Sequence, residues 1–104
     1  MKYGLTPQQL GLILGCFKKF PEIEKVILFG SRAMGNQKPG SDVDLMIVGA
    51  NVSGQTVTRL FGCLNEEISV PFKFDLVREP VDSDLKTHIE QHGIVIFLAT
   101  SDTH

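Results

Sequence analysis

Apolar residues recur along this chain with two spacings, one typical of helices and one typical of strands. Helical spacing follows Thr6, Ser53 and Asp82 or Ser83, and each of these side chains can cap a helix N-terminus. Gln9 lies three residues after Thr6 and completes a capping box. Four short apolar runs predict strands, and these cover residues 25–29, 43–48, 72–77 and 94–98.

The order of these elements predicts the fold class. The chain begins with a helix, a strand and a short helical turn at Ser31–Met34, and strands then alternate with helices. This order indicates an α/β or α+β fold, with helices on one small sheet. Gly93 is expected to close the last helix. The 104 residues suffice for one domain, which we assign to residues 1–99, with a loose tail at 100–104.

Three aspartates interrupt the predicted strands. Asp42 and Asp44 point to one face of their strand because alternate strand residues share a face. Asp75 interrupts a strongly apolar run, where a charge needs a partner. Taken alone, Asp75 would pair with Lys73 or Arg78 at the surface. With the other two acids on a neighbouring strand, convergence of all three carboxylates is the better interpretation.

Converging carboxylates repel one another unless a positive charge lies between them, and hard divalent cations are the usual solution. Two such ions can clamp the attacking and leaving oxygens in phosphoryl or nucleotidyl transfer. Asp42 and Asp44 would then bridge both Mg²⁺ ions. Asp75 would bind the ion nearer the acceptor and take the proton of the acceptor hydroxyl.

A Gly-Ser pair lies shortly before the first two acids. Gly30 and Ser31 form either an ordinary strand-to-helix turn or a phosphate site, in which the glycine allows close approach and the serine hydroxyl donates. Spacing and flanking strands favour the phosphate site, although no P-loop pattern is present. Arg32 either reaches a phosphate or covers the surface. Lys38 and Lys73 are weaker phosphate candidates, expected to be solvated.

Composition and the remaining polar residues narrow the classes of function. The net charge of −2 argues against a general nucleic-acid binder, and no apolar run is long enough to span a bilayer, so we expect a cytoplasmic protein.

Cys16 and Cys63 fall on apolar helix faces and are expected to be buried, reduced thiols rather than a disulfide or metal pair. His88 and His92 are expected to form a solvent-facing pair near a helix C-terminus.

The acidic motif and the Gly-Ser turn together resemble the DNA polymerase β-type nucleotidyltransferase superfamily, and most of all its minimal nucleotidyltransferase (MNT) branch. The resemblance covers nearly the whole chain and rests on Gly30-Ser31-Arg32-Ala33-x-Gly35, Ser41-Asp42-x-Asp44-Leu45 and Phe74-Asp75-Leu76-Val77. It implies a nucleotidyltransferase fold with a mixed sheet. It also implies that Gly30 and Ser31 bind the triphosphate of ATP, and that Asp42, Asp44 and Asp75 hold Mg²⁺. Met34 stands where the family often has a basic residue.

The resemblance further implies a partner. Members of this branch bind small all-helical HEPN-type proteins and act as antitoxins that transfer AMP from ATP to a tyrosine of that partner. Because this chain has little left after its core is built, a second chain or a homo-oligomer is expected to complete the site. Two alternatives stay open: a module that neutralises a helical partner by contact without catalysis, and a transferase acting on a small hydroxylated molecule such as an aminoglycoside.

Overall fold

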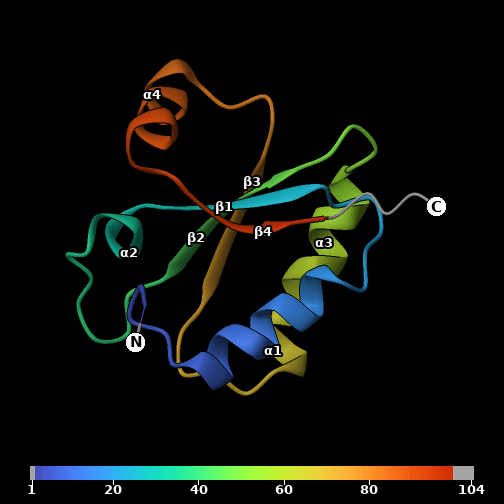
Figure 1. Cartoon of the computed structure of the whole chain (residues 1–104). Coiled ribbons are helices and arrows are strands. Elements are labelled where there is room, and N and C mark those ends of the chain that lie inside the picture. The colour runs from blue at the N-terminus through green and yellow to red at the C-terminus, as the bar shows by residue number, and fades with distance from the viewer. Residues whose placement is uncertain (1, 100–104) are drawn as a thin grey trace.

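A four-stranded sheet lies at the centre of the molecule in a computed structural model that describes residues 2–99 (Figure 1). In chain order the elements are α1 (Pro7–Phe17), β1 (Lys25–Phe29), α2 (Ser31–Met34), β2 (Val43–Val48), α3 (Gly54–Gly62), the π-helical turn η1 (Cys63–Glu67), β3 (Phe74–Arg78), α4 (Ser83–His92) and β4 (Ile94–Leu98). The predicted order is confirmed, although β3 starts two residues later than expected. The predicted tail, residues 100–104, lies outside the described residues, and the division into one domain and a tail stays a prediction.

The sheet is mixed, with strand order β3-β2-β1-β4. β1 pairs antiparallel with both β2 and β4, whereas β2 and β3 run parallel because α3 and η1 carry the chain back between them. The parallel pair begins where the Val43 N–H donates to the Lys73 carbonyl at 2.9 Å. This pairing sets the two acid-bearing strands side by side in the same direction.

The helices cover both faces of the sheet. α1, α3 and η1 pack on one face and α4 lies over the other (Figure 1). The first face takes alternate residues of β2, including Val43 and Leu45, into the main core, while Met46 joins the smaller core beneath α4. The predicted alternation of β2 is therefore confirmed: Asp44 lies on the α4 side of the sheet.

Side-chain caps begin the long helices where the sequence predicted them. Thr6 and Gln9 form the expected reciprocal capping box, and the Asp82 carboxylate accepts the Leu85 N–H at 2.7 Å. Gly93 ends α4, but in an extended conformation rather than a left-handed cap. The glycine is needed because a Cβ there would lie 2.7 Å from the Ile27 side chain.

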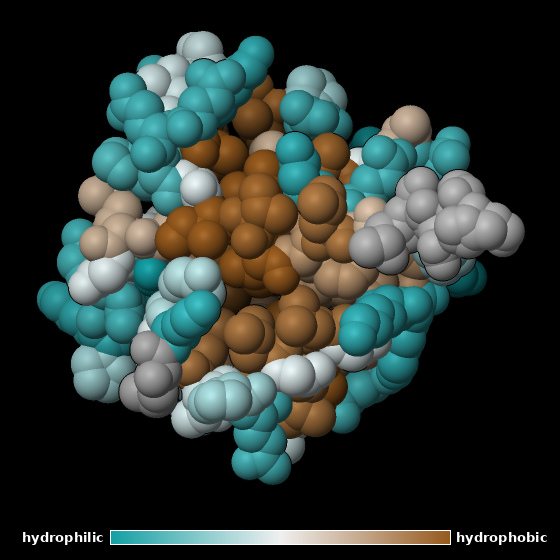
Figure 2. Space-filling view, in the orientation of Figure 1, coloured by the Kyte–Doolittle hydropathy of each residue, from teal (hydrophilic) through white to brown (hydrophobic). Residues whose placement is uncertain are grey.

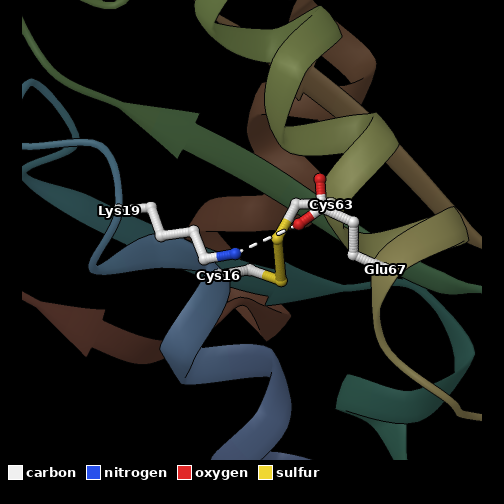
Figure 3. Close-up of polar contacts among 4 residues, drawn as sticks. All are labelled: Cys16, Lys19, Cys63 and Glu67. Atoms are coloured by element: carbon white, nitrogen blue, oxygen red, sulfur yellow. Dashed lines mark hydrogen bonds and ion pairs between the residues drawn. A yellow bond between two sulfur atoms is a disulfide. The ribbon is translucent and has the colours of Figure 1, made fainter.

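The prediction of reduced cysteines is wrong in this structure. Cys16 of α1 and Cys63 of η1 form a disulfide between residues 47 apart, with Cα atoms 6.1 Å apart (Figure 3). Both are buried, as expected. Their helices pack together, a proximity that helical periodicity does not reveal. Beside the disulfide, Lys19 donates to the Glu67 carboxylate at 3.1 Å.

One face of the molecule is strongly apolar. Figure 2 shows apolar side chains gathered over β4 and between α1 and α4. Along the edge strand β4, Val95 and Leu98 are 51% and 67% exposed. In residues 2–99 no helix has both the length and the apolar character that crossing a membrane requires.

Candidate functional site

The candidate acids gather at one end of the parallel strand pair. Asp44 of β2 is the register partner of Asp75 of β3, and Asp42 lies just before β2. Register partners in neighbouring strands project to the same face of a sheet. The third acid therefore lies on the same side as Asp44, away from the core that contains Val43 and Phe74.

The charges of these acids act on one another. Burial raises the pKa of the Asp44 carboxyl above its usual range, and the negative charges of Asp75 and then Asp42 raise that pKa further. The positive charge of Arg32 lowers it in part. Asp42 and Asp75 are exposed, whereas Asp44 is half-buried. The site is thus an open acidic corner whose half-buried carboxyl, that of Asp44, has a raised pKa.

The carboxylate oxygens of the three aspartates are ligands that suit a hard divalent cation, and such a cation relieves the repulsion between them. The side chains are close enough to influence one another but are not drawn into a ligand shell. Across residues 2–99, no group of three or more His, Cys, Asp or Glu side chains is arranged to hold a metal ion. Asp42, Asp44 and Asp75 are the residues that would hold such a cation.

The Gly-Ser turn touches the acidic corner directly. Gly30 is the residue before α2 and has φ 78° and ψ −156°, a region that essentially only glycine adopts. A Cβ at Gly30 would overlap the carboxylate of Asp44. Ser31 follows as the first residue of α2. The turn and the acid are therefore packed against each other, as a site for a metal-bound phosphate requires.

Arg32 is not a surface residue, and that alternative is wrong. Its side chain is 4% exposed, and its guanidinium lies 4.7 Å from the centre of the Phe72 ring. It donates to three backbone carbonyls: Ser41 at 2.7 Å, Tyr3 at 3.0 Å and Gly4 at 3.3 Å. Burial lowers the pKa of Arg32, and Asp42 and Asp44 offset this in part. The contact of Arg32 with a phosphate stays a prediction. Its hydrogen bonds connect the N-terminal segment to the loop before β2.

His88 contradicts the prediction of a solvent-facing pair. Its Nε2 accepts the backbone N–H of Gly30 at 3.0 Å, and its ring packs edge-on against Phe29, with centroids 6.1 Å apart. His92 is exposed, as expected. A signal was present in the sequence: Leu85, His88 and Ile89 share helical spacing, which turns His88 toward the sheet.

Asn65 is a second residue that the sequence reasoning missed. Its Oδ1 accepts the Phe74 N–H at 3.0 Å and its Nδ2 donates to the Phe61 carbonyl at 3.1 Å. It thereby ties the end of the α3–η1 helix to the start of β3, one residue before Asp75. No pattern in the sequence marks it. Lys38 and Lys73 are exposed, as expected.

Comparisons with known proteins identify the family of this chain. The family model described as polymerase beta, nucleotidyltransferase matches residues 13–102. The chain belongs to this nucleotidyltransferase family. The resemblance drawn from the sequence is therefore confirmed. No curated protein matched the sequence.

Several solved structures share the fold of this nucleotidyltransferase. A chain from a toxin–antitoxin crystal structure with AMP-PNP has a TM-score of 0.69 at 20% identity, over 86% of this chain and 73% of the other. A chain from the toxin–antitoxin MntA-HepT has a TM-score of 0.67 at 16% identity, over 90% and 74%. A chain from the tri-AMPylated Shewanella oneidensis HEPN toxin in complex with MNT antitoxin has a TM-score of 0.62 at 17% identity, over 86% and 70%. The predicted nucleotidyltransferase fold is confirmed.

Proposed function

We propose that this chain is a Mg²⁺-dependent adenylyltransferase of the cytoplasm that moves AMP from ATP to a tyrosine hydroxyl of a small helical HEPN-type partner, as the antitoxin of a toxin–antitoxin pair. One observation carries the proposal. Asp44, whose pKa is raised by burial and by the charges of Asp75 and Asp42, lies against the Gly30 turn. Anionic groups crowded beside a glycine turn at a sheet end suit a metal–triphosphate substrate.

The family and the structural neighbours support the same reaction class. The polymerase beta family model covers most of the chain. Among structures of the same fold, one is a toxin–antitoxin with AMP-PNP and another contains a tri-AMPylated HEPN toxin with its MNT antitoxin. By analogy with these proteins, we propose that this chain uses a nucleotide as substrate, transfers AMP, and has a HEPN-type protein as the acceptor.

The transfer step is an in-line displacement at the α-phosphorus of ATP. The acceptor oxygen forms a bond to that phosphorus, and the bond from phosphorus to the oxygen bridging the α- and β-phosphates breaks. Pyrophosphate leaves, and the proton of the acceptor hydroxyl passes to the Asp75 carboxylate. Gly30 and Ser31 hold the triphosphate, so that the α-phosphorus faces the acceptor.

Asp42, Asp44 and Asp75 would hold the Mg²⁺ ions of this reaction. Bound Mg²⁺ neutralises charge on the triphosphate and on the leaving pyrophosphate. The chain's own contribution is to keep the three carboxylates on one face of the sheet. The half-burial of Asp44 makes its negative charge costly without a cation, which favours cation binding.

A contact-only module is the second candidate, and the exposed apolar surface along β4 favours it. Val95 and Leu98 stand open on that strand, as an interface with a protein partner would require. In this case the partner would be neutralised by binding alone. Transfer to a small hydroxylated molecule has no comparable feature in its favour.

Labelled transfer tests the proposal. The chain is incubated with α-labelled ATP, Mg²⁺ and the helical protein encoded beside it, and label on the partner is followed. Asp42→Asn and Asp75→Asn should each reduce label transfer at least about a hundredfold, because preorganised charge at a reacting phosphate contributes several kcal/mol. Asp84→Asn, an exposed acid of α4, is the matched control and should transfer normally.

Each outcome separates the candidates. Transfer that disappears in the aspartate variants and on chelation of Mg²⁺ supports the adenylyltransferase. A partner that binds the wild-type chain without receiving label identifies the contact-only module. Label appearing on a small aminoglycoside but not on the protein points to the third candidate.

A further inference from the structure

The hydrogen bond between Gly30 and His88 connects two parts of the chain that are 58 residues apart. Gly30 belongs to the turn after β1, and His88 belongs to α4, which lies over the sheet on the side away from α1 and α3 (Figure 1). The Nε2 atom accepts this bond, so the ring proton of the neutral imidazole is on Nδ1. The sequence motif of the family contains only one of these two residues.

Gly30 needs contacts with other residues to keep a single backbone conformation. Its φ of 78° with ψ of −156° is a sparsely populated conformation, and glycine has no side chain with which to pack itself in place. Its carbonyl accepts the Met34 N–H at 3.2 Å at the start of α2, the Asp44 carboxylate lies on one side, and the imidazole of His88 accepts its N–H. The orientation of the peptide that follows, and hence of Ser31, depends on this conformation.

The imidazole is itself held in place. His88 is half-buried, packs edge-on against Phe29, and is followed by Ile89, whose side chain is 7% exposed. α4 therefore presents a fixed acceptor to the glycine turn. An acceptor that was free to rotate could not select one conformation of a flexible residue.

We infer that His88 is a positioning residue of the nucleotide site, which holds Gly30 in the conformation that directs Ser31 toward the triphosphate. The inference rests on the proposed function, and it extends the site to α4, which the sequence motif does not include. The role is distinct from catalysis because the imidazole acts through the Gly30 backbone. It predicts that nucleotide binding depends on an acceptor atom at position 88.

Binding of AMP-PNP with Mg²⁺, measured by calorimetry, tests the inference without needing an acceptor protein. His88→Ala should weaken binding about three- to tenfold, the effect of losing one hydrogen bond. His88→Phe keeps an aromatic ring beside Phe29 but removes the acceptor, and it should weaken binding by the same factor. His88→Gln supplies an acceptor oxygen and should recover most of the affinity. If His88→Ala fails to fold, the affinities of His88→Phe and His88→Gln are compared instead, and the inference requires weaker binding in His88→Phe.

Two control variants separate positioning from general packing. Glu90→Gln changes an exposed side chain of α4 and should bind as wild type does. Ile89→Val loosens the packing of α4 without touching Gly30, and it should lower the melting temperature without changing the affinity. The amide resonance of Gly30 gives a direct readout, because it should shift in His88→Ala and His88→Phe but not in Glu90→Gln.

The possible results are distinguishable. Affinity unchanged in both His88→Ala and His88→Phe overturns the inference, and so does an equal loss in Ile89→Val. Weakened binding with a Gly30 resonance that does not move also overturns it. If the wild-type chain itself does not bind AMP-PNP with Mg²⁺, the proposed function fails, and the inference fails with it.

Discussion

Asp44 and Asp75 are register partners in the parallel pair of β2 and β3, so two like charges project from the same face of the sheet. Neighbouring like charges in strands destabilise a fold unless something compensates for them. Burial is the largest cause of the raised pKa of Asp44, and the negative charge of Asp75 raises that pKa further. Arg32 offsets this repulsion only in part, and the arrangement suits a ligand that brings further positive charge.

Stability should therefore increase when the Asp44 charge is removed. The pKa of Asp44 is raised in the folded chain, so its contribution favours folding below the unfolded value of about 3.9 and is lost as the pH rises through the folded value. At neutral pH the ionised carboxylate is a cost. We expect Asp44→Asn to raise the free energy of unfolding at pH 7 by less than about 1 kcal/mol, because the group is partly open to water.

Urea unfolding at several pH values measures this effect. The advantage of Asp44→Asn should disappear near pH 3, where the wild-type carboxyl is protonated. Asp84→Asn, on the exposed first turn of α4, should show no such pH-dependent gain. A lower stability of Asp44→Asn at pH 7 would contradict the interpretation.

Gly30→Ala should disable the turn. The new Cβ would overlap the Asp44 carboxylate, and the positive φ of 78° would add strain of about 1–3 kcal/mol. We expect a lower melting temperature and loss of AMP-PNP binding. Gly11→Ala is the matched control, because a Cβ there meets no atom within 4 Å. As a helical position of α1, Gly11 should accept alanine with unchanged or slightly raised stability.

Arg32→Lys should destabilise the chain although the charge is kept. Lysine cannot reproduce the planar fork that reaches the carbonyls of Ser41, Tyr3 and Gly4. We expect a loss of about 2–3 kcal/mol in the free energy of unfolding. Arg59→Lys, on the exposed side of α3, should cost little. Unchanged stability with weaker AMP-PNP binding would favour the phosphate role of Arg32 instead.

Reduction of the Cys16–Cys63 disulfide should lower stability without affecting the nucleotide site. The bond closes a span of 47 residues, and a cross-link of this kind contributes about 2–4 kcal/mol. Thermal unfolding with and without dithiothreitol measures the difference, and a thiol count verifies the redox state. In the double variant Cys16→Ala and Cys63→Ala, dithiothreitol should have no effect. AMP-PNP affinity should stay constant, because the disulfide lies on the α1 side of the sheet.

The predictions that succeeded rest on local patterns. The capping box at Thr6, the alternation of β2 and the position of the Gly30 turn follow from interactions within a few residues, which short-range periodicity and side-chain chemistry capture. The expectation that Asp75 lies on the face of Asp44 also succeeded, because the alternation of both strands is read from their apolar residues.

The predictions that failed concern side chains whose partners are distant in sequence. Cys16 and Cys63 look like two separate buried thiols until α1 and η1 are packed together. Arg32 has no local signal for carbonyls that lie in the N-terminal segment and in the loop before β2. His88 was assigned to solvent because a histidine pair near a helix end is usually exposed.

Local spacing and a compact motif are enough to predict the elements, the sheet-facing residues and the family to which the chain belongs. Tertiary structure alone decided which side chains meet. It brings Asp44 beside Asp75 through the parallel register, Gly30 to His88 on the α4 side of the sheet, and Cys16 to Cys63 between helices. The physical reason is that such contacts depend on how whole elements pack, and packing is a sum over many residues that no short stretch of chain contains.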